Sequence, residues 1–150
     1  MTASDELLTI ERVAVLQRAA MFSAVPGHTL VAVARVLEKV RVAPGTVVIE
    51  RGAFEDWLFV VAEGKVRAHI GDRVLVDRGP GGVFGELAIV APAARSASVT
   101  AIEHSLLLRL RRQPFEELLE DHADIARTVI ASLATRLQEL ADEDAKAGPR

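Results

Sequence analysis

Residues 81–99 read Gly-Gly-Val-Phe-Gly-Glu-Leu-Ala-Ile-Val-Ala-Pro-Ala-Ala-Arg-Ser-Ala-Ser-Val. A glycine-rich turn leads into Glu86 and a short apolar segment. We interpret this segment as a one-turn helix that Pro92 ends, because proline has no N–H and the residue before it avoids helical angles. The first amides of such a helix, at Leu87 and Ala88, lack an internal partner and can face an anion. Arg95 follows with a guanidinium suited to phosphate oxygens, and Glu86 can accept a hydrogen bond from a hydroxyl, so the stretch predicts a sugar-phosphate site.

The same stretch resembles the phosphate-binding cassette of the cyclic nucleotide-binding domain family, the superfamily of the catabolite activator protein and the protein kinase A regulatory subunit. The resemblance rests on residues 84–89 and 95–99, with the glutamate and the arginine at the family's spacing. It implies that Glu86 holds the ribose 2′-hydroxyl and that Arg95 holds the cyclic phosphate. The other ligand-binding residues that it implies are Phe84, Gly85, Leu87, Ala88, Ser96 and Ala97, most of them through backbone or hydroxyl groups.

One position departs from the family's pattern. The family usually has a proline directly before the arginine, whereas this chain has Ala94 there and its proline earlier, at Pro92. Two side chains also have simpler roles open to them. Glu86 is favourable at a helix start without any ligand, and the Ser96 hydroxyl can bond nearby backbone. A degenerate member of the fold, acting as a dimerisation or assembly module with an empty pocket, is therefore the alternative to a nucleotide-binding domain.

Composition limits the classes of protein to consider. The chain has 150 residues, enough for a single domain over 1–150, and it is 50% hydrophobic and 26% charged with a net charge of −3. No basic patch stands out, so nucleic acid is not an expected partner. Cysteine is absent, and no apolar run approaches the roughly 20 residues that span a bilayer. With no signal-peptide pattern at its acidic N-terminus, the protein is expected to be cytoplasmic, without direct membrane insertion.

The order of patterns along the chain predicts the fold class. Helices are expected over Asp5–Ala20 and His28–Glu38, short strands over 39–110, and helices again over 112–145. Pro44-Gly45 suits a type II turn between the first two strands. We therefore expect an α+β, mainly β domain. The resemblance implies an eight-stranded β-roll of the jelly-roll type, with the cassette at 82–99. The polar residues Lys146–Arg150 are expected to form a disordered tail.

Enzyme chemistry finds little support. The four histidines, at positions 28, 69, 104 and 122, are scattered among different predicted elements and lack metal-ligand spacing. No nucleophile elbow is present either, so we expect neither a metal, nor a cofactor, nor an enzyme. Trp57 is expected to pack in the core.

The long C-terminal helix has three roles open to it. Its apolar stripe, which runs from Ile125 through Val129, Leu133 and Leu137 to Leu140, can pack on its own barrel, form a homodimer seam, or cover a nucleotide base. In the third case Arg127, Ile130 and Arg136 could reach the base.

The leading hypothesis is a regulatory domain that binds cAMP or another cyclic nucleotide. It would relay occupancy through its C-terminal helices by population shift. Strands around Val74, Val83 and Val99 are expected to give the sugar and base an apolar wall. The chain's opening resembles the lead-in found when this domain is a module of a larger bacterial protein. The base preference stays open.

Overall fold

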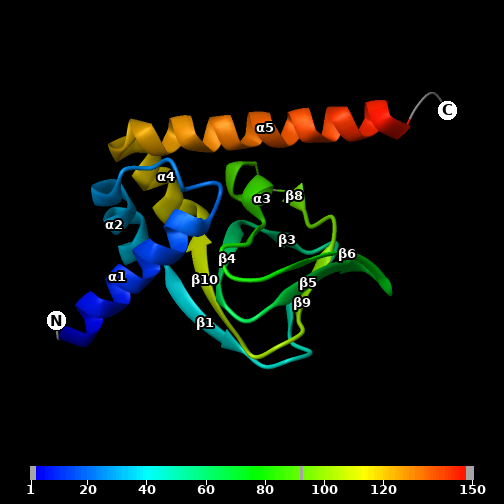
Figure 1. Ribbon diagram of the computed structural model, residues 1–150, viewed down its shortest axis with the longest axis horizontal. Coiled ribbons are helices and arrows are strands. Elements are labelled where there is room, and N and C mark those ends of the chain that lie inside the picture. The colour runs from blue at the N-terminus through cyan, green and yellow to red at the C-terminus, as the bar shows by residue number, and fades with distance from the viewer. Residues whose placement is uncertain (1–2, 92, 148–150) are drawn as a thin grey trace.

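The structure is a computed structural model that describes residues 3–91 and 93–147. Two helices come first, α1 (Ala3–Arg18) and α2 (Gly27–Val36). Within the described residues, ten strands and one short helix follow: β1 (Glu38–Val42), β2 (Val47–Ile49), β3 (Phe54–Glu55), β4 (Trp57–Glu63), β5 (Val66–Ile70), β6 (Arg73–Arg78), β7 (Val83–Phe84), α3 (Glu86–Val90), β8 (Ala93–Ala94), β9 (Ser98–Ala101) and β10 (Ser105–Arg111). Helices α4 (Arg112–Asp121) and α5 (Ala123–Ala147) end the described chain, with α5 running along one side of the molecule and past the sheets (Figure 1).

The strands form two four-stranded antiparallel sheets and a small ribbon. One sheet has the order β1-β10-β4-β7, the other has the order β2-β9-β5-β6, and β3 pairs with β8. The chain moves repeatedly from one sheet to the other, as in a roll. The predicted class, α+β with mainly β structure of the jelly-roll type, is confirmed, whereas the ribbon was not predicted.

Strand β4 contributes side chains to two hydrophobic cores, one on each face of its sheet. Its side chains alternate, so that Leu58 and Val60 pack against the helices while Phe59 and Val61 face the space between the sheets. The helical core includes Phe22, Leu30, Phe115 and Ile125, all buried. Because both faces of β4 are covered, its sequence is almost continuously apolar rather than alternating.

Turn chemistry agrees with the prediction at Pro44-Gly45. The Thr46 amide donates to the Ala43 carbonyl at 3.1 Å, and Gly45 has φ +90°, a value that L side chains rarely adopt. The ends of several elements differ from those predicted. Helix α2 ends at Val36 because Leu37 is extended, and Glu38 already belongs to β1. The expected tail starts too early, since α5 continues to Ala147; residues 148–150 lie outside the described part.

Helix α5 divides into a packed part and an exposed part. Ile125 and Val129 are buried in the helical core, and Leu133 packs against it, so the first turns rest on the domain itself. Farther along the same helix, Leu137 is 68% exposed. Three described members of the stripe, Ile125, Val129 and Leu133, therefore pack on the domain itself and Leu137 does not, while the side chain of Leu140 is not among those described.

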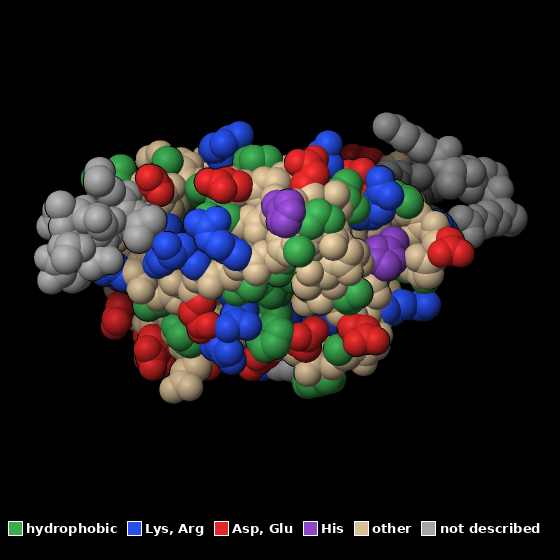
Figure 2. All heavy atoms as spheres, turned by 90° about the horizontal axis from the view of Figure 1, so that it is seen from below, with side chains coloured by type: hydrophobic (Ala, Val, Ile, Leu, Met, Phe, Trp, Pro, Cys, Tyr) green, Lys and Arg blue, Asp and Glu red, His purple; other side chains and the backbone are tan. Residues whose placement is uncertain are grey.

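The surface carries charges of both signs. On the face seen in Figure 2, acidic and basic side chains are interspersed around a strip of hydrophobic side chains, and neither sign forms a continuous patch. Within the described residues, no helix is long and apolar enough to cross a membrane.

Candidate functional site

The backbone of Arg95 is held between two parts of the chain that are distant in sequence. The Arg95 amide donates to the Ala53 carbonyl, and the Gly52 amide donates to the Arg95 carbonyl, each at 2.8 Å. These bonds continue the β3–β8 ribbon, in which Phe54 pairs with Ala94. The alanine that stands where the family usually has proline therefore lies in a strand, directly before the arginine.

The side chain of Arg95 turns into the protein. The residue is only 7% exposed, and its Nη2 donates to the Trp57 carbonyl at 2.5 Å. Its Nε is buried and has no hydrogen-bond partner among the described residues. The Oε1 atom of the Glu55 carboxylate is 3.6 Å from Nε, an ion pair longer than a hydrogen bond.

Burial sets the electrostatics of this guanidinium. Desolvation lowers the pKa of Arg95, and the carboxylates of Glu55 and Asp56 oppose that shift. Arginine nevertheless stays protonated in proteins. The site therefore holds a buried positive charge whose Nε donor has no hydrogen-bond partner among the described residues, and an anion oxygen is an acceptor that would satisfy it.

Gly85 makes the inward position of Arg95 possible. Its φ is +87°, and a Cβ added there would lie 2.6 Å from Arg95 Nη1 and 2.8 Å from the Trp57 carbonyl oxygen. A side chain at position 85 would thus strain the backbone and collide with the guanidinium. The structure brings together Gly85 and Arg95, as the sequence predicted.

Helix α3 starts directly after this glycine, with the half-buried Glu86 as its first residue. One prediction about this helix is wrong. The Ala88 amide does not face outward; it donates to the Gly85 carbonyl at 3.1 Å, because the left-handed turn at Gly85 closes the first turn of α3 on itself. Leu87 lies in α3 by its backbone, and Pro92, expected to end this helix, falls outside the described residues.

The remaining predicted residues are neighbours of Gly85 or Arg95 in the sequence. Phe84 in β7 is half-buried and packs into the core between the sheets, Ser96 is exposed, and Ala97 is half-buried. Sequence reasoning missed Glu55 and the Trp57 carbonyl, because nothing in the local pattern marks a contact with a residue about 40 positions later. Trp57 itself packs against the core as predicted. The guanidinium carbons of Arg109 and Arg111 lie 5.2 and 5.5 Å from the centroid of its ring.

The predicted apolar wall is partly wrong. Val99 is buried between the sheets as expected, but Val83 packs against the helical core. Val74 is 51% exposed, and Val76 takes the inward position instead. The cause is a register shift between Ala68 and His69, which pairs Val74 with the outward-facing His69.

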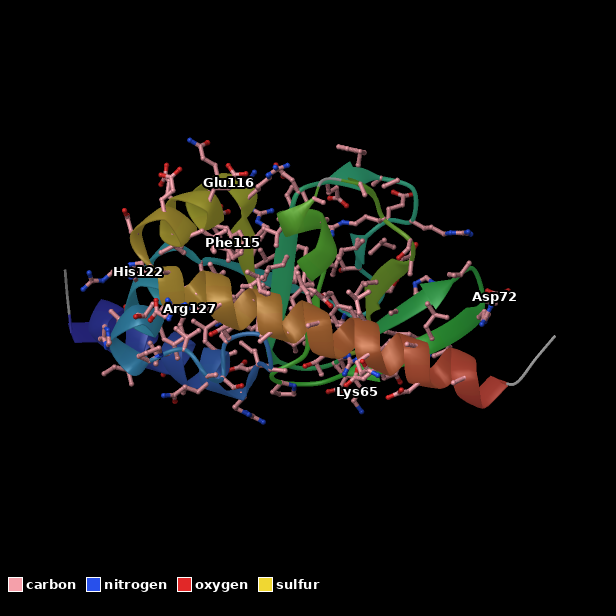
Figure 3. The ribbon with its side chains drawn as sticks, turned by 90° about the horizontal axis from the view of Figure 1, so that it is seen from above. Lys65, Asp72, Phe115, Glu116, His122 and Arg127 are labelled. Carbon is pink, nitrogen blue, oxygen red and sulfur yellow. The ribbon has the colours of Figure 1, made fainter. Side chains whose placement is uncertain are left out.

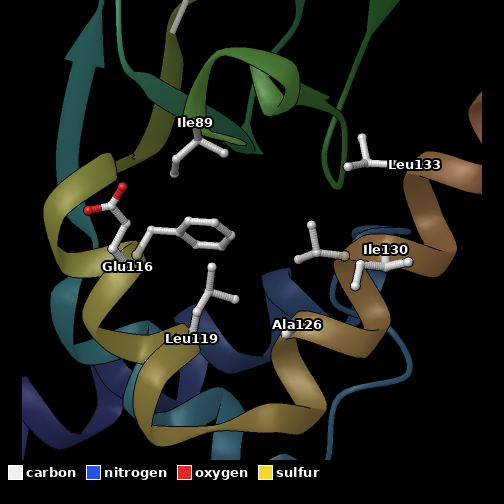
Figure 4. A pocket seen from close by; sticks show the side chains of 8 residues that line it. Ile89, Glu116, Leu119, Ala126, Ile130 and Leu133 are labelled. Atoms are coloured by element: carbon white, nitrogen blue, oxygen red, sulfur yellow. The ribbon is translucent and has the colours of Figure 1, made fainter. Parts of the chain in front are cut away.

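An apolar crevice connects α3 with the C-terminal helices. It has a volume of about 200 Å³ and is lined by Ile89 of α3, three residues of α4 (Phe115, Glu116 and Leu119) and four of α5 (Ala126, Val129, Ile130 and Leu133). Figure 4 shows Ile89 directed towards this space from the α3 side. His122 lies at the corner between α4 and α5 (Figure 3), so α5 turns back over α3 from that point.

Of the three predicted base contacts on α5, Arg127 and Ile130 are exposed, and the side chain of Arg136 is not among those described. Metal ligands do not cluster in the described part of the chain: it contains no group of three or more His, Asp and Glu side chains that could hold a metal ion.

Comparisons with known proteins find clear relatives. The family model described as "Cyclic nucleotide-binding domain" matches residues 39–122. The chain is 35% identical over 112 residues to the Pycsar effector protein XpPycTIR of Xanthomonas perforans, covering 73% of this chain and 36% of that protein. It is 37% identical over 100 residues to the cyclic AMP receptor protein of Thermus thermophilus, covering 63% of this chain and 46% of that protein.

A solved structure agrees with these matches. The N-terminal domain of a transcriptional regulator from Streptomyces coelicolor superposes with a TM-score of 0.77 at 29% identity, covering 86% of this chain and 93% of that one. The chain spans about a third to a half of the length of the two curated relatives.

Proposed function

The chain belongs to the cyclic nucleotide-binding domain family, and from that premise we propose that it binds cAMP or a close relative as a regulatory domain. In this proposal the domain binds its ligand and does no chemistry on it. Arg95 holds the cyclic phosphate and Glu86 accepts a hydrogen bond from the ribose 2′-hydroxyl. Phe84, Gly85, Leu87, Ser96 and Ala97 form the rest of the site, whereas Ala88 is left out because its amide donates to the Gly85 carbonyl.

The observation that carries the proposal is the unpaired Nε of the buried Arg95. A buried donor without a partner costs about 1–3 kcal/mol, and a buried charge costs more unless it is paired. Glu55 offsets part of this cost at 3.6 Å without hydrogen bonding to Nε. A phosphate oxygen would pair with the charge and accept a hydrogen bond from Nε. Binding would therefore remove a free-energy cost that the unpaired guanidinium carries in the free protein.

The proposed output is a shift in how α4 and α5 sit on α3. Ile89 is 1% exposed, belongs to α3, and lines the crevice that α4 and α5 share. A ligand that draws α3 towards the phosphate moves Ile89, and packing there favours one position of the two helices. The size of the shift is set by the ligand's differential affinity for the two positions.

Isothermal titration of the protein with cAMP, cGMP and cCMP tests binding. We expect saturable binding of at least one of them and a loss of about tenfold or more in Arg95→Ala, because a charge-assisted hydrogen bond contributes about 1.5–3 kcal/mol. Arg35→Ala, which removes an exposed arginine of α2, is the matched control and should bind like wild type. Binding by none of the three, or equal binding by Arg95→Ala, contradicts the proposal.

Amide hydrogen exchange with and without the best ligand tests the relay. We expect altered protection in α4 and α5 on binding, and a smaller alteration in Ile89→Ala. The degenerate alternative has a different signature: a dimer, seen by sedimentation, whose mass and protection pattern do not respond to any cyclic nucleotide.

A further inference from the structure

Glu55 places a second carboxylate at the candidate phosphate site. Its Oε1 lies 3.6 Å from Arg95 Nε, and the side chains of Glu55 and Arg95 are 18% and 5% exposed. Nε itself makes no hydrogen bond among the described residues. Glu55 therefore stands beside Nε, a donor that has no partner among the described residues and that a phosphate oxygen can use.

The position of Glu55 is fixed by backbone pairing rather than by a free loop. Glu55 pairs with Ala93 in the β3–β8 ribbon, so it is a diagonal neighbour of Arg95. The bonds of Gly52 and Ala53 to the Arg95 backbone extend the same ribbon. A ligand bound at Nε could displace the Glu55 carboxylate by rotating its side chain. It could not displace strand β3 without breaking these backbone hydrogen bonds.

The charge balance around the site follows from these positions. The guanidinium of Arg95 has one carboxylate at its side, that of Glu55. Asp56 is exposed and adds a weaker field of the same sign, opposing the fall in the pKa of Arg95. Because repulsion grows with ligand charge, a phosphate with two charges suffers about twice the penalty of a phosphate with one.

We propose that Glu55 makes this site selective for a singly charged phosphodiester over a doubly charged phosphomonoester. The inference rests on the function proposed above and concerns the same site. Glu55 has two effects. In the free protein it compensates the buried guanidinium, and in the complex it repels the anion that shares that guanidinium. A cyclic nucleotide carries one phosphate charge and tolerates this neighbour, whereas its linear hydrolysis product carries nearly two.

The test compares cAMP with 5′-AMP by isothermal titration at about pH 8, where a monoester carries nearly two charges because its second pKa is about 6. Wild type, Glu55→Gln and Asp56→Asn are titrated in parallel. We expect Glu55→Gln to bind cAMP about threefold tighter and 5′-AMP about tenfold tighter or more, which narrows the preference for cAMP. Asp56→Asn removes the same charge from an exposed neighbour and should change both affinities less than about twofold.

Thermal melting supplies a second readout. Glu55→Gln should melt below wild type without ligand, because Arg95 loses its counter-ion, and should gain more in melting temperature from cAMP than wild type does. Glu55→Asp keeps the negative charge but places it farther from Arg95. If Glu55→Gln does not fold, Glu55→Asp should show the same changes in affinity and melting temperature, with smaller magnitudes.

Equal affinity gains for the two ligands, or unchanged affinities in Glu55→Gln and Glu55→Asp, overturn the proposal. That result leaves the proposed function standing if wild type still binds cAMP through Arg95. Absence of cAMP binding by wild type and both Glu55 variants overturns the function and this inference together.

Discussion

Gly85 and Arg95 lie so close that a Cβ added to the glycine would stand 2.6 Å from the Nη1 of the arginine. Nine residues separate them in sequence, and the short helix α3 lies between them. The inward position of the guanidinium therefore requires a residue without a Cβ at position 85. The site is therefore sensitive to a single methyl group at position 85.

We predict that Gly85→Ala both destabilises the domain and weakens nucleotide binding. Gly45→Ala is the control, because Gly45 has a similar φ of +90° but nothing within 4 Å of its added Cβ. Strain at a positive φ costs about 1–2 kcal/mol at either position, and only Gly85→Ala adds the collision with Arg95. Urea denaturation should therefore rank Gly85→Ala as the less stable variant, and titration should show reduced affinity in it alone. Equal losses of stability would refute the contact.

A second prediction concerns the start of α5. Thr29 of α2 is 1% exposed and donates from Oγ1 to Asp124 Oδ2 at 3.0 Å, which ties the two helices together. Thr29→Val keeps the shape and removes the donor, so we expect a loss of about 1.5–3 kcal/mol of unfolding free energy, the range for a hydrogen bond to a charged group. Thr135→Val removes an exposed hydroxyl bond within α5 and should change stability by less than about 0.5 kcal/mol.

Urea denaturation of both variants against wild type provides the measurement. If Thr29→Val is as stable as Thr135→Val, the bond between α2 and α5 contributes nothing, and α5 is held by its apolar contacts alone.

A third prediction concerns acid. Arg109 donates to Glu38 at 2.5 Å, and this hydrogen bond lowers the pKa of the carboxyl; burial opposes the shift and the bond from Arg111 adds to it. A lowered pKa in the folded state gives stability that is complete above the ordinary carboxyl value of about 4.3 and is lost as pH falls through the lowered one. Glu38→Gln should therefore be less stable than wild type at neutral pH and should converge with it in acid.

The measurement is urea denaturation at several pH values between about 7 and 3. Some acid sensitivity should remain in Glu38→Gln, because Asp77, bound by Arg67, also has a lowered pKa. Glu50→Gln, at an exposed position, serves as the control and should follow the wild-type curve. A constant difference between Glu38→Gln and wild type at every pH would show that the ion pairs with Arg109 and Arg111 do not cause it.

The sequence predicted those parts of the molecule whose signal is local. The family, the mainly β class, the turn at Gly45 and the short helix after Gly85 are confirmed, because each rests on a few neighbouring residues with strong conformational preferences. The inward position of Arg95 was also expected from the cassette, and the structure places its side chain inside. The ligand contacts stay a prediction.

What the sequence could not predict depends on long-range pairing. Strands β3 and β8 have two residues each, which is too few to show an alternation of apolar and polar residues. The sequence therefore could not predict the ribbon that brings Glu55 next to Arg95. Val74 was assigned to the wrong face because one register shift between Ala68 and His69 reverses the alternation along β6. Such a shift is decided by contacts between strands, not by either strand's residues.

The most direct test of the central claim is a crystal structure of this domain with bound cAMP. We predict a phosphate oxygen within hydrogen-bond distance of Arg95 Nε, with the ribose 2′-hydroxyl at Glu86 and the Arg95 bond to the Trp57 carbonyl retained. Density for the phosphate elsewhere, or a guanidinium that points into solvent while the nucleotide is bound, would contradict the account.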